Sequence, residues 1–173
     1  MKFDKVAIAL GAVIILLLAA IIVQQSGVAG LTLDKVEKNA RKTHKIEANW
    51  SVAEDHSDSV CALLFFDEAK ENYRFSVYFT GEDSTAGFLE GESSTEYPYM
   101  AENVQAINYQ DKGIVLASLN REKVTLIVTA GEEVFEYLVS SGQPFVLVLP
   151  LDCGEITLYD LSGNEVRCYD AYR

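Results

Sequence analysis

The residues of this 173-residue chain that could carry chemistry include two histidines, three cysteines and many carboxylates. One histidine lies in the acidic run Glu54-Asp-His-Ser-Asp58, where Asp55, His56 and Asp58 are residue types that bind metal ions. Neighbouring residues of one turn rarely converge on an ion without a ligand from elsewhere in the chain. We therefore interpret the run as a solvated turn between two strands, and we expect no metal ion and no other cofactor.

The sequence lacks the common catalytic motifs. It contains no Gly-x-Ser-x-Gly, His-Glu-x-x-His, P-loop or Gly-x-Gly-x-x-Gly pattern, and both histidines are poorly placed for a catalytic triad. Twenty-six Asp and Glu residues make chance pairs of carboxylates inevitable. We predict a protein that is not an enzyme, and a hydrolase that uses paired acids remains an alternative.

The cysteine count is odd, so at least one thiol is free or pairs between chains. Cys61 lies in an apolar run and is expected in the core. A bridge between Cys153 and Cys168 would need a bend at Gly154, because Cα atoms of a disulfide lie within about 7 Å. We expect no obligatory disulfide.

The segment from Ser84 to Ala101 interrupts the surrounding strand pattern and is predicted to be a long surface loop with one short strand near residues 87–89. It combines acidic residues with aromatic ones, which are enriched at protein interfaces. We predict that its tyrosines anchor a partner inside an acidic rim. The predicted partner-binding residues are Tyr97, Tyr99, Glu90, Glu92 and Glu96. A glycan or a divalent cation bound by the same loop is an alternative.

The elements that must position these residues are predicted to be strands. Tyr73–Thr80 alternates apolar and polar residues as a half-buried strand does, and Val60–Phe66 is apolar on both faces, as in a central strand. From residue 113 to 169, turn residues recur about every ten positions, with a hairpin signal at residues 161–163. This spacing predicts an all-β domain, an antiparallel β-sandwich (Ig-like or similar), over residues 45–173.

A different pattern occupies the N-terminus. Residues 6–23 contain no charge and no proline, and as a helix they would span about 27 Å, close to the hydrocarbon core of a bilayer. We predict a cytoplasmic tail (1–5), a transmembrane helix (6–23) and a juxtamembrane stalk (24–44). The short basic tail favours an orientation with the C-terminal domain outside the cytoplasm. A cleaved signal peptide is the alternative for this segment.

The charge distribution excludes one class of partner. The chain carries a net charge of −12, and residues 46–111 hold fourteen acidic but only two basic residues. Such a surface repels phosphates, so no nucleic acid is expected as a partner.

The C-terminal run from Gly142 to Val166 contains Pro-Phe-x-x-x-Leu-Pro followed by Gly-x-x-x-x-Tyr-Asp-x-x-Gly-Asn. It resembles a segment of small uncharacterised single-span membrane proteins of Gram-positive clostridia. The resemblance implies a bacterial, anchored, β-rich protein and carries no activity with it. We therefore predict a single-pass cell-membrane protein whose extracytoplasmic domain acts in protein–protein or cell-envelope interaction.

Overall fold

A computed structural model describes residues 30–80, 87–94 and 98–172 of the chain. The predicted tail, the predicted transmembrane helix and the first residues of the predicted stalk, 24–29, lie outside these described residues. Within them, neither helix is both long enough and apolar enough to cross a bilayer.

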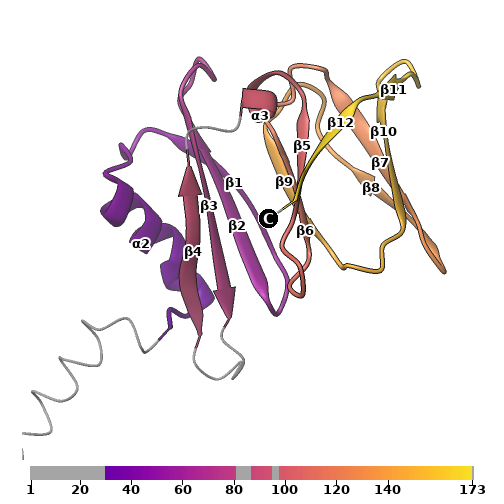
Figure 1. The fold of residues 1–173 in the computed structure, drawn as a ribbon. Coiled ribbons are helices and arrows are strands. Elements are labelled where there is room, and N and C mark those ends of the chain that lie inside the picture. Colours follow the sequence, from indigo (N-terminus) through magenta and orange to yellow (C-terminus); the bar gives the residue numbers. More distant parts are fainter. Residues whose placement is uncertain (1–29, 81–86, 95–97, 173) are drawn as a thin grey trace, which may run out of the picture.

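The described residues form two helices and three β-sheets (Figure 1). Helix α2 spans Leu33–His44 and helix α3 spans Pro98–Glu102. Sheet A consists, in spatial order, of β1 (Ser51–His56), β2 (Val60–Phe66), β3 (Tyr73–Thr80) and β4 (Phe88–Ser94). Sheet B consists of β12 (Cys168–Tyr172), β5 (Val104–Asn108), β6 (Ile114–Ser118) and β9 (Phe145–Leu149). Sheet C consists of β11 (Glu165–Val166), β10 (Glu155–Asp160), β7 (Val124–Ala130) and β8 (Val134–Leu138).

Helix α2 covers one face of sheet A, and this corrects the predicted stalk. Val36 is only 1% exposed, and with Ala40 it packs on the sheet residues Leu63, Phe65 and Tyr78. Just before the helix, Leu31 exchanges two backbone hydrogen bonds with Phe88 of β4 (2.7 and 2.8 Å). Residues 31–44 therefore belong to the folded body, because the apolar stripe of the helix is buried by the sheet instead of lying along a linker.

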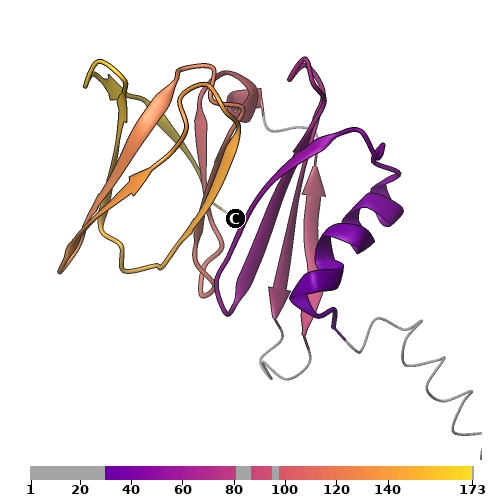
Figure 2. The same cartoon turned by 180° about the vertical axis from the view of Figure 1, so that it is seen from behind.

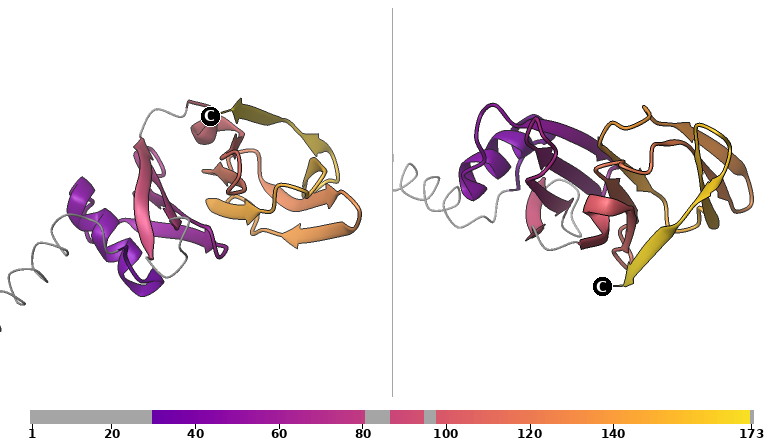
Figure 3. Two further views of the ribbon diagram at one scale, coloured as in Figure 1. Left: turned by 60° about the horizontal axis from the view of Figure 1, so that its bottom comes forward. Right: turned by 90° about the horizontal axis from the view of Figure 1, so that it is seen from above.

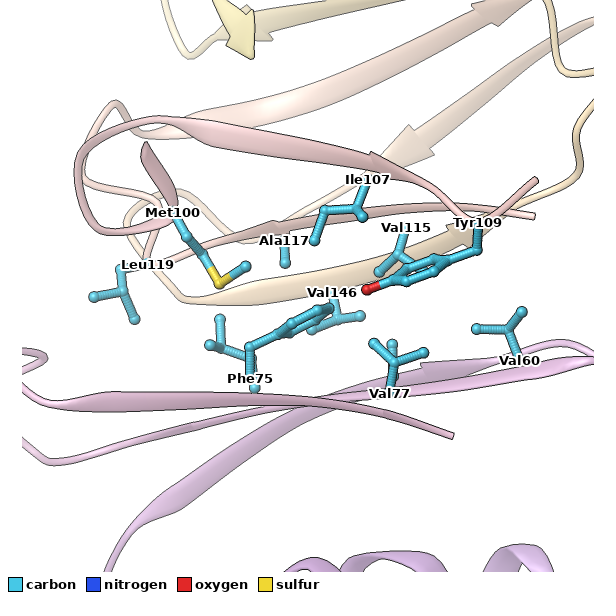
Figure 4. Close-up of a cluster of buried hydrophobic side chains, with 12 residues drawn as sticks. Val60, Phe75, Val77, Met100, Ile107, Tyr109, Val115, Ala117, Leu119 and Val146 are labelled. Atoms are coloured by element: carbon cyan, nitrogen blue, oxygen red, sulfur yellow. The ribbon is translucent and has the colours of Figure 1, made fainter. Parts of the chain in front are cut away.

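The opposite face of sheet A packs on sheet B, and Figure 4 shows the side chains between them. The predicted strand at residues 73–80 is confirmed as β3, with Phe75 and Val77 pointing into this layer and Tyr78 to the helix. Its predicted half-buried position is wrong, because Ser76 and Tyr78 on the opposite face are buried as well. The predicted central position of β2 is confirmed as well, because β2 lies between β1 and β3 and is buried on both faces. The buried residues of this layer are Val60, Ala62, Leu64, Phe75, Val77, Met100, Ile107, Tyr109, Val115, Ala117, Leu119 and Val146.

Sheet C packs on the other face of sheet B, so sheet B is the middle layer of three (Figures 1 and 3). The buried residues of this second layer are Val104, Ala106, Leu116, Val124, Ile127, Phe145, Leu149, Cys153 and Leu158. The β-rich, mainly antiparallel prediction is confirmed. The single sandwich over residues 45–173 is replaced by three stacked sheets and a covering helix.

The last strand also departs from the predicted antiparallel pattern. The predicted hairpin at residues 161–163 is confirmed, with Tyr159 opposite Glu165 and Leu158 opposite Val166. After Arg167 the chain leaves sheet C, and β12 pairs in parallel with β5 of sheet B, Cys168 lying opposite Val104. The chain that follows the hairpin turn is therefore divided between β11 in sheet C and β12 in sheet B.

The predicted loop Ser84–Ala101 is wrong for most of its described length. Residues 88–94 form β4, which pairs with β3 on both sides of a bulge at Gly91, and residues 98–102 form helix α3. Gly91 explains why this strand was hard to recognise: a Cβ atom at that position would lie 2.1 Å from the ring of Phe79. A glycine inside a strand weakens the sequence signal, and here it makes room for an aromatic ring from the neighbouring strand.

Candidate functional site

The five predicted partner-binding residues fall into three groups. Glu96 and Tyr97 lie outside the described residues. Tyr99 lies in α3, and its side chain is not among those that the structure describes. Glu90 and Glu92 lie on strand β4 instead of a loop.

Glu90 makes its contact within the folded body. Its carboxylate lies 2.5 Å from Nε2 of His44, the last residue of α2. Arg74 of β3 lies on the other side of the same ring, with Nη1 3.4 Å from Nδ1. Glu90 therefore helps to hold the end of the helix against the edge of sheet A.

Glu92 lies beside a cavity of about 370 Å³ that Phe79, Tyr109 and Lys112 also line. The hydroxyl of Tyr109 donates a hydrogen bond to Oε2 of Glu92 at 3.2 Å. The ring of Tyr109 is buried and meets Phe79 edge to face, with 5.0 Å between the ring centres. A sugar needs an exposed aromatic face for stacking, so this geometry gives little support to the glycan alternative.

The acidic run Glu54–Asp58 has a structural contact that its sequence does not reveal. Asp55 lies on edge strand β1, and its Oδ2 accepts a hydrogen bond from the backbone N–H of Val148 in β9 at 2.8 Å. This bond joins sheet A to sheet B. Among the described residues, no three His, Cys, Asp or Glu side chains are grouped as a metal site would require.

The three cysteines lie in different surroundings, and Cys61 and Cys153 are free thiols. Burial, reinforced by Glu54 and Asp55, raises the pKa of Cys61 to about 12. Burial also raises the pKa of Cys153 above its ordinary value. A protonated thiol is a poor nucleophile, so neither residue has the character of a catalytic cysteine. The prediction that Cys61 is a core residue is confirmed.

The most exposed apolar surface in the described part of the chain lies on sheet C, on the side of the molecule away from α2 (Figure 2). In strand β8, Val134 is 67% exposed, Phe135 is 50% exposed and Leu138 is 85% exposed. Val134 and Leu138 lie on the outer face of the sheet, opposite Ala130 and Leu126 of β7. Tyr159 of β10 lies opposite Leu126 and continues the apolar row across the sheet. We call this surface, β8 with the outer face of β7 and β10, the sheet C surface.

Strand β8 is also an edge. It pairs with β7 on one side, and no other strand of the described residues pairs with it on the other. Edge strands of folded proteins are usually blunted by lysine, proline or a covering element, because their free backbone groups can pair with another chain. Strand β8 combines a free edge with exposed apolar side chains.

The strands of sheet C and the segments that join them carry only negative charge, with Lys123 and Arg167 directly flanking this range. Residues 124–166, which include all four strands of sheet C, contain seven acidic residues and no lysine or arginine. Three of the acids, Glu132, Glu133 and Glu136, lie in or next to β8, and all three are exposed. A partner for this surface must therefore tolerate or complement negative charge.

Sequence reasoning missed the role of β8. The signal was present in the run Glu133-Val-Phe-Glu-Tyr-Leu138, where large apolar residues occur on both faces of the strand. That pattern is typical of a central strand. Only the sheet order shows that the strand lies at an edge, where the same residues are exposed.

Comparison of the chain with protein-family models, curated proteins and solved structures gave no match.

Proposed function

We propose that the chain is a membrane-anchored, extracytoplasmic module without enzymatic activity, which binds an extended segment of a partner protein along strand β8. The anchor rests on the uncharged apolar run at residues 6–23. The observation that carries the binding role is the free edge of β8 with three large apolar side chains at least half exposed. Monomeric proteins rarely leave such surfaces uncovered unless the surface is used.

The chemistry of the partner follows from the surface. A strand added to β8 would satisfy its backbone groups, and alternate side chains would lie on the apolar row of the outer face. The neighbouring carboxylates favour a segment that carries lysine or arginine beside its apolar residues. Pairing with β8 of a second copy would bring Glu136 and its neighbouring acids close to their own counterparts. We therefore favour a different, basic partner over self-association.

The test is site-specific photocrosslinking in intact membranes. A photoreactive amino acid at Leu138 should yield one dominant adduct, whose crosslinked peptide is extended, apolar and basic when sequenced by mass spectrometry. The matched control position is Leu161, which is 78% exposed but lies in the hairpin turn beyond β10. The substitution Val134→Lys should lower the yield at Leu138 about tenfold without changing the free energy of unfolding, because Val134 is largely exposed.

Two outcomes would contradict the proposal. One is equal crosslinking at the two positions, which would indicate random contacts. The other is an adduct of twice the chain mass as the main product, which would show that a second copy occupies the edge.

A further inference from the structure

Helix α2 carries a stripe of lysines on the side that faces away from sheet A. Lys35, Lys38 and Lys42 occur at positions i, i+3 and i+7, which lie on one face of an α-helix, and all three are exposed. Lys45, which caps the C-terminal end of the same helix, is exposed as well. We call these four residues the α2 lysine stripe.

The charge of the α2 lysine stripe is not neutralised within the folded body. Among the residues that the structure describes, no carboxylate forms an ion pair with any of the four lysines. Arg41 differs from them, because its guanidinium is held by Glu37 at 2.7 Å and by two backbone carbonyls. Asp34 in the first turn is an exposed acid, so the outer face of α2 keeps a net positive charge.

The opposite side of the molecule is negative. The layers follow in the order α2, sheet A, sheet B and sheet C, so α2 and sheet C are the two outermost layers (Figure 1). Residues 124–166, which include the four strands of sheet C, contain seven acidic residues and no lysine or arginine. The field of an anionic surface would therefore orient the body with α2 toward that surface and sheet C away from it.

The length of the chain before α2 limits its distance from the predicted membrane span. Six residues, 24–29, separate that span from Gly30, the first residue that the structure describes. A fully extended chain covers at most about 3.6 Å per residue, so Gly30 lies within roughly 25 Å of the end of the span. Helix α2 begins three residues later, at Leu33. In an anchored chain, α2 is therefore the first element of the described body to reach the bilayer surface.

We infer that the α2 lysine stripe binds the anionic phospholipid surface of the membrane and holds the body with sheet C facing away from the bilayer. This inference rests on the proposed membrane anchor and adds the orientation of the anchored body. The ammonium groups contact phosphates of the lipid headgroups, which attract basic residues beside a bilayer. The acids of sheet C then lie farthest from the negative surface, and the free edge of β8 stays accessible to its partner.

The chain contains its own reporter for this orientation. Trp50 is the only tryptophan, and it packs beside the core between α2 and sheet A. Energy transfer from Trp50 to dansyl-labelled lipid headgroups becomes more efficient as this side of the molecule approaches the bilayer. Trp50→Phe combined with Leu161→Trp moves the reporter to the side of sheet C, since Leu161 is 78% exposed in the hairpin beyond β10.

The experiment uses the full chain, one copy per disc, in lipid nanodiscs of phosphatidylcholine alone or with about one third phosphatidylglycerol. Transfer from Trp50 should be at least twofold more efficient in the anionic discs. Salt at 1 M should remove the difference, because it shortens the Debye length to about 3 Å. The double variant with the reporter on the side of sheet C should show no increase in the anionic discs.

Two triple variants test the stripe itself. Glutamine at all three helical positions of the stripe should lower the transfer in anionic discs to the value in neutral discs. The matched control removes the same charge outside α2, through Lys112→Gln, Arg121→Gln and Lys123→Gln, and should keep the twofold increase. Both variants should remain folded, as checked by circular dichroism, because substitutions of surface side chains rarely change stability.

Equal transfer from Trp50 in the two lipids, or an undiminished increase in the stripe variant, would overturn the inference. An equal increase from the reporter on the side of sheet C would do the same, because it would show that no face is preferred. Elution of the chain with the discs in 1 M salt tests the anchor separately. A chain that stays with the discs but does not respond to lipid charge refutes the orientation alone, whereas a chain that leaves the discs refutes the anchor and the orientation together.

Discussion

The side chain of Asn120 connects two turns of this protein through three hydrogen bonds. Asn120 is 1% exposed and has a positive φ of 55°, in the left-handed region that asparagine tolerates better than most residues. Its side chain accepts from the backbone N–H of Val124 at 2.7 Å and donates to the carbonyls of Val124 and Ser140, both at 3.1 Å. It therefore joins the turn between β6 and β7 to the connection between β8 and β9.

Replacement of this asparagine by alanine should be severe. Asn120→Ala removes three hydrogen bonds, leaves the buried N–H of Val124 without an acceptor and places alanine at a positive φ, so we expect a loss of about 3 kcal/mol in the free energy of unfolding. Urea denaturation of the full chain measures this loss. The control is Asn164→Ala in the exposed hairpin, where the asparagine bonds to Asp160 at 3.0 Å in solvent. Equal losses for the two variants would contradict this assignment.

At the level of single elements, α2 differs most from its predicted role. Arg41 of this helix pairs with Glu37 at 2.7 Å, donates to the carbonyls of Glu47 and Trp50 and lies 4.9 Å from the centre of the Phe65 ring. The residue lies in the segment that the sequence analysis predicts to be a juxtamembrane stalk. Its contacts instead fix the chain between the helix and β1.

If α2 is part of the folded body, its buried face must contribute to stability. Val36→Ala removes two methyl groups from a packed site and should lower the free energy of unfolding by about 2 kcal/mol. Leu33→Ala on the same helix is the matched control, since Leu33 is 40% exposed and its change should stay within about 0.5 kcal/mol. Denaturant unfolding distinguishes the two. A harmless Val36→Ala would restore the interpretation of this segment as a stalk.

For the whole molecule, the decisive feature is that sheet B is shared. One face of sheet B completes the core with sheet A, and the other face completes the core with sheet C. Strand β12 reinforces this arrangement, because the last residues return to β5 and Gln105 donates a side-chain hydrogen bond to the carbonyl of Tyr169 at 2.7 Å. The two cores therefore cannot separate as independent domains.

The shared sheet predicts a single unfolding transition. Trp50 is the only tryptophan and packs beside the core between α2 and sheet A, so its fluorescence reports that end of the molecule. Its transition should coincide with the one seen by circular dichroism. Leu116→Ala, in the core between sheets B and C, should lower both midpoints together through a loss of about 3 kcal/mol. Two separate midpoints would show that the cores unfold independently.

The sequence alone was sufficient for features set by local chemistry. The strands β2 and β3, the turns of the C-terminal half and the core position of Cys61 follow from apolar alternation and turn residues, which act over a few positions. Strand β4 was not predicted over its full length, because acidic residues and a glycine are typical of loops. Only the structure shows that the ring of Phe79, on the neighbouring strand, occupies the space beside Gly91.

Only the tertiary structure decided which strands are central and which are edges. Apolar residues on both faces of a strand are buried in β2, whose faces are covered by α2 and by sheet B. They are exposed in β8, which lies at an edge of sheet C and whose outer face no element of the described residues covers. The burial of α2 and the crossing of β12 to sheet B likewise depend on partners distant in the chain. The physical reason is that hydrophobic patterning specifies that a surface must be covered, but packing between distant segments determines what covers it.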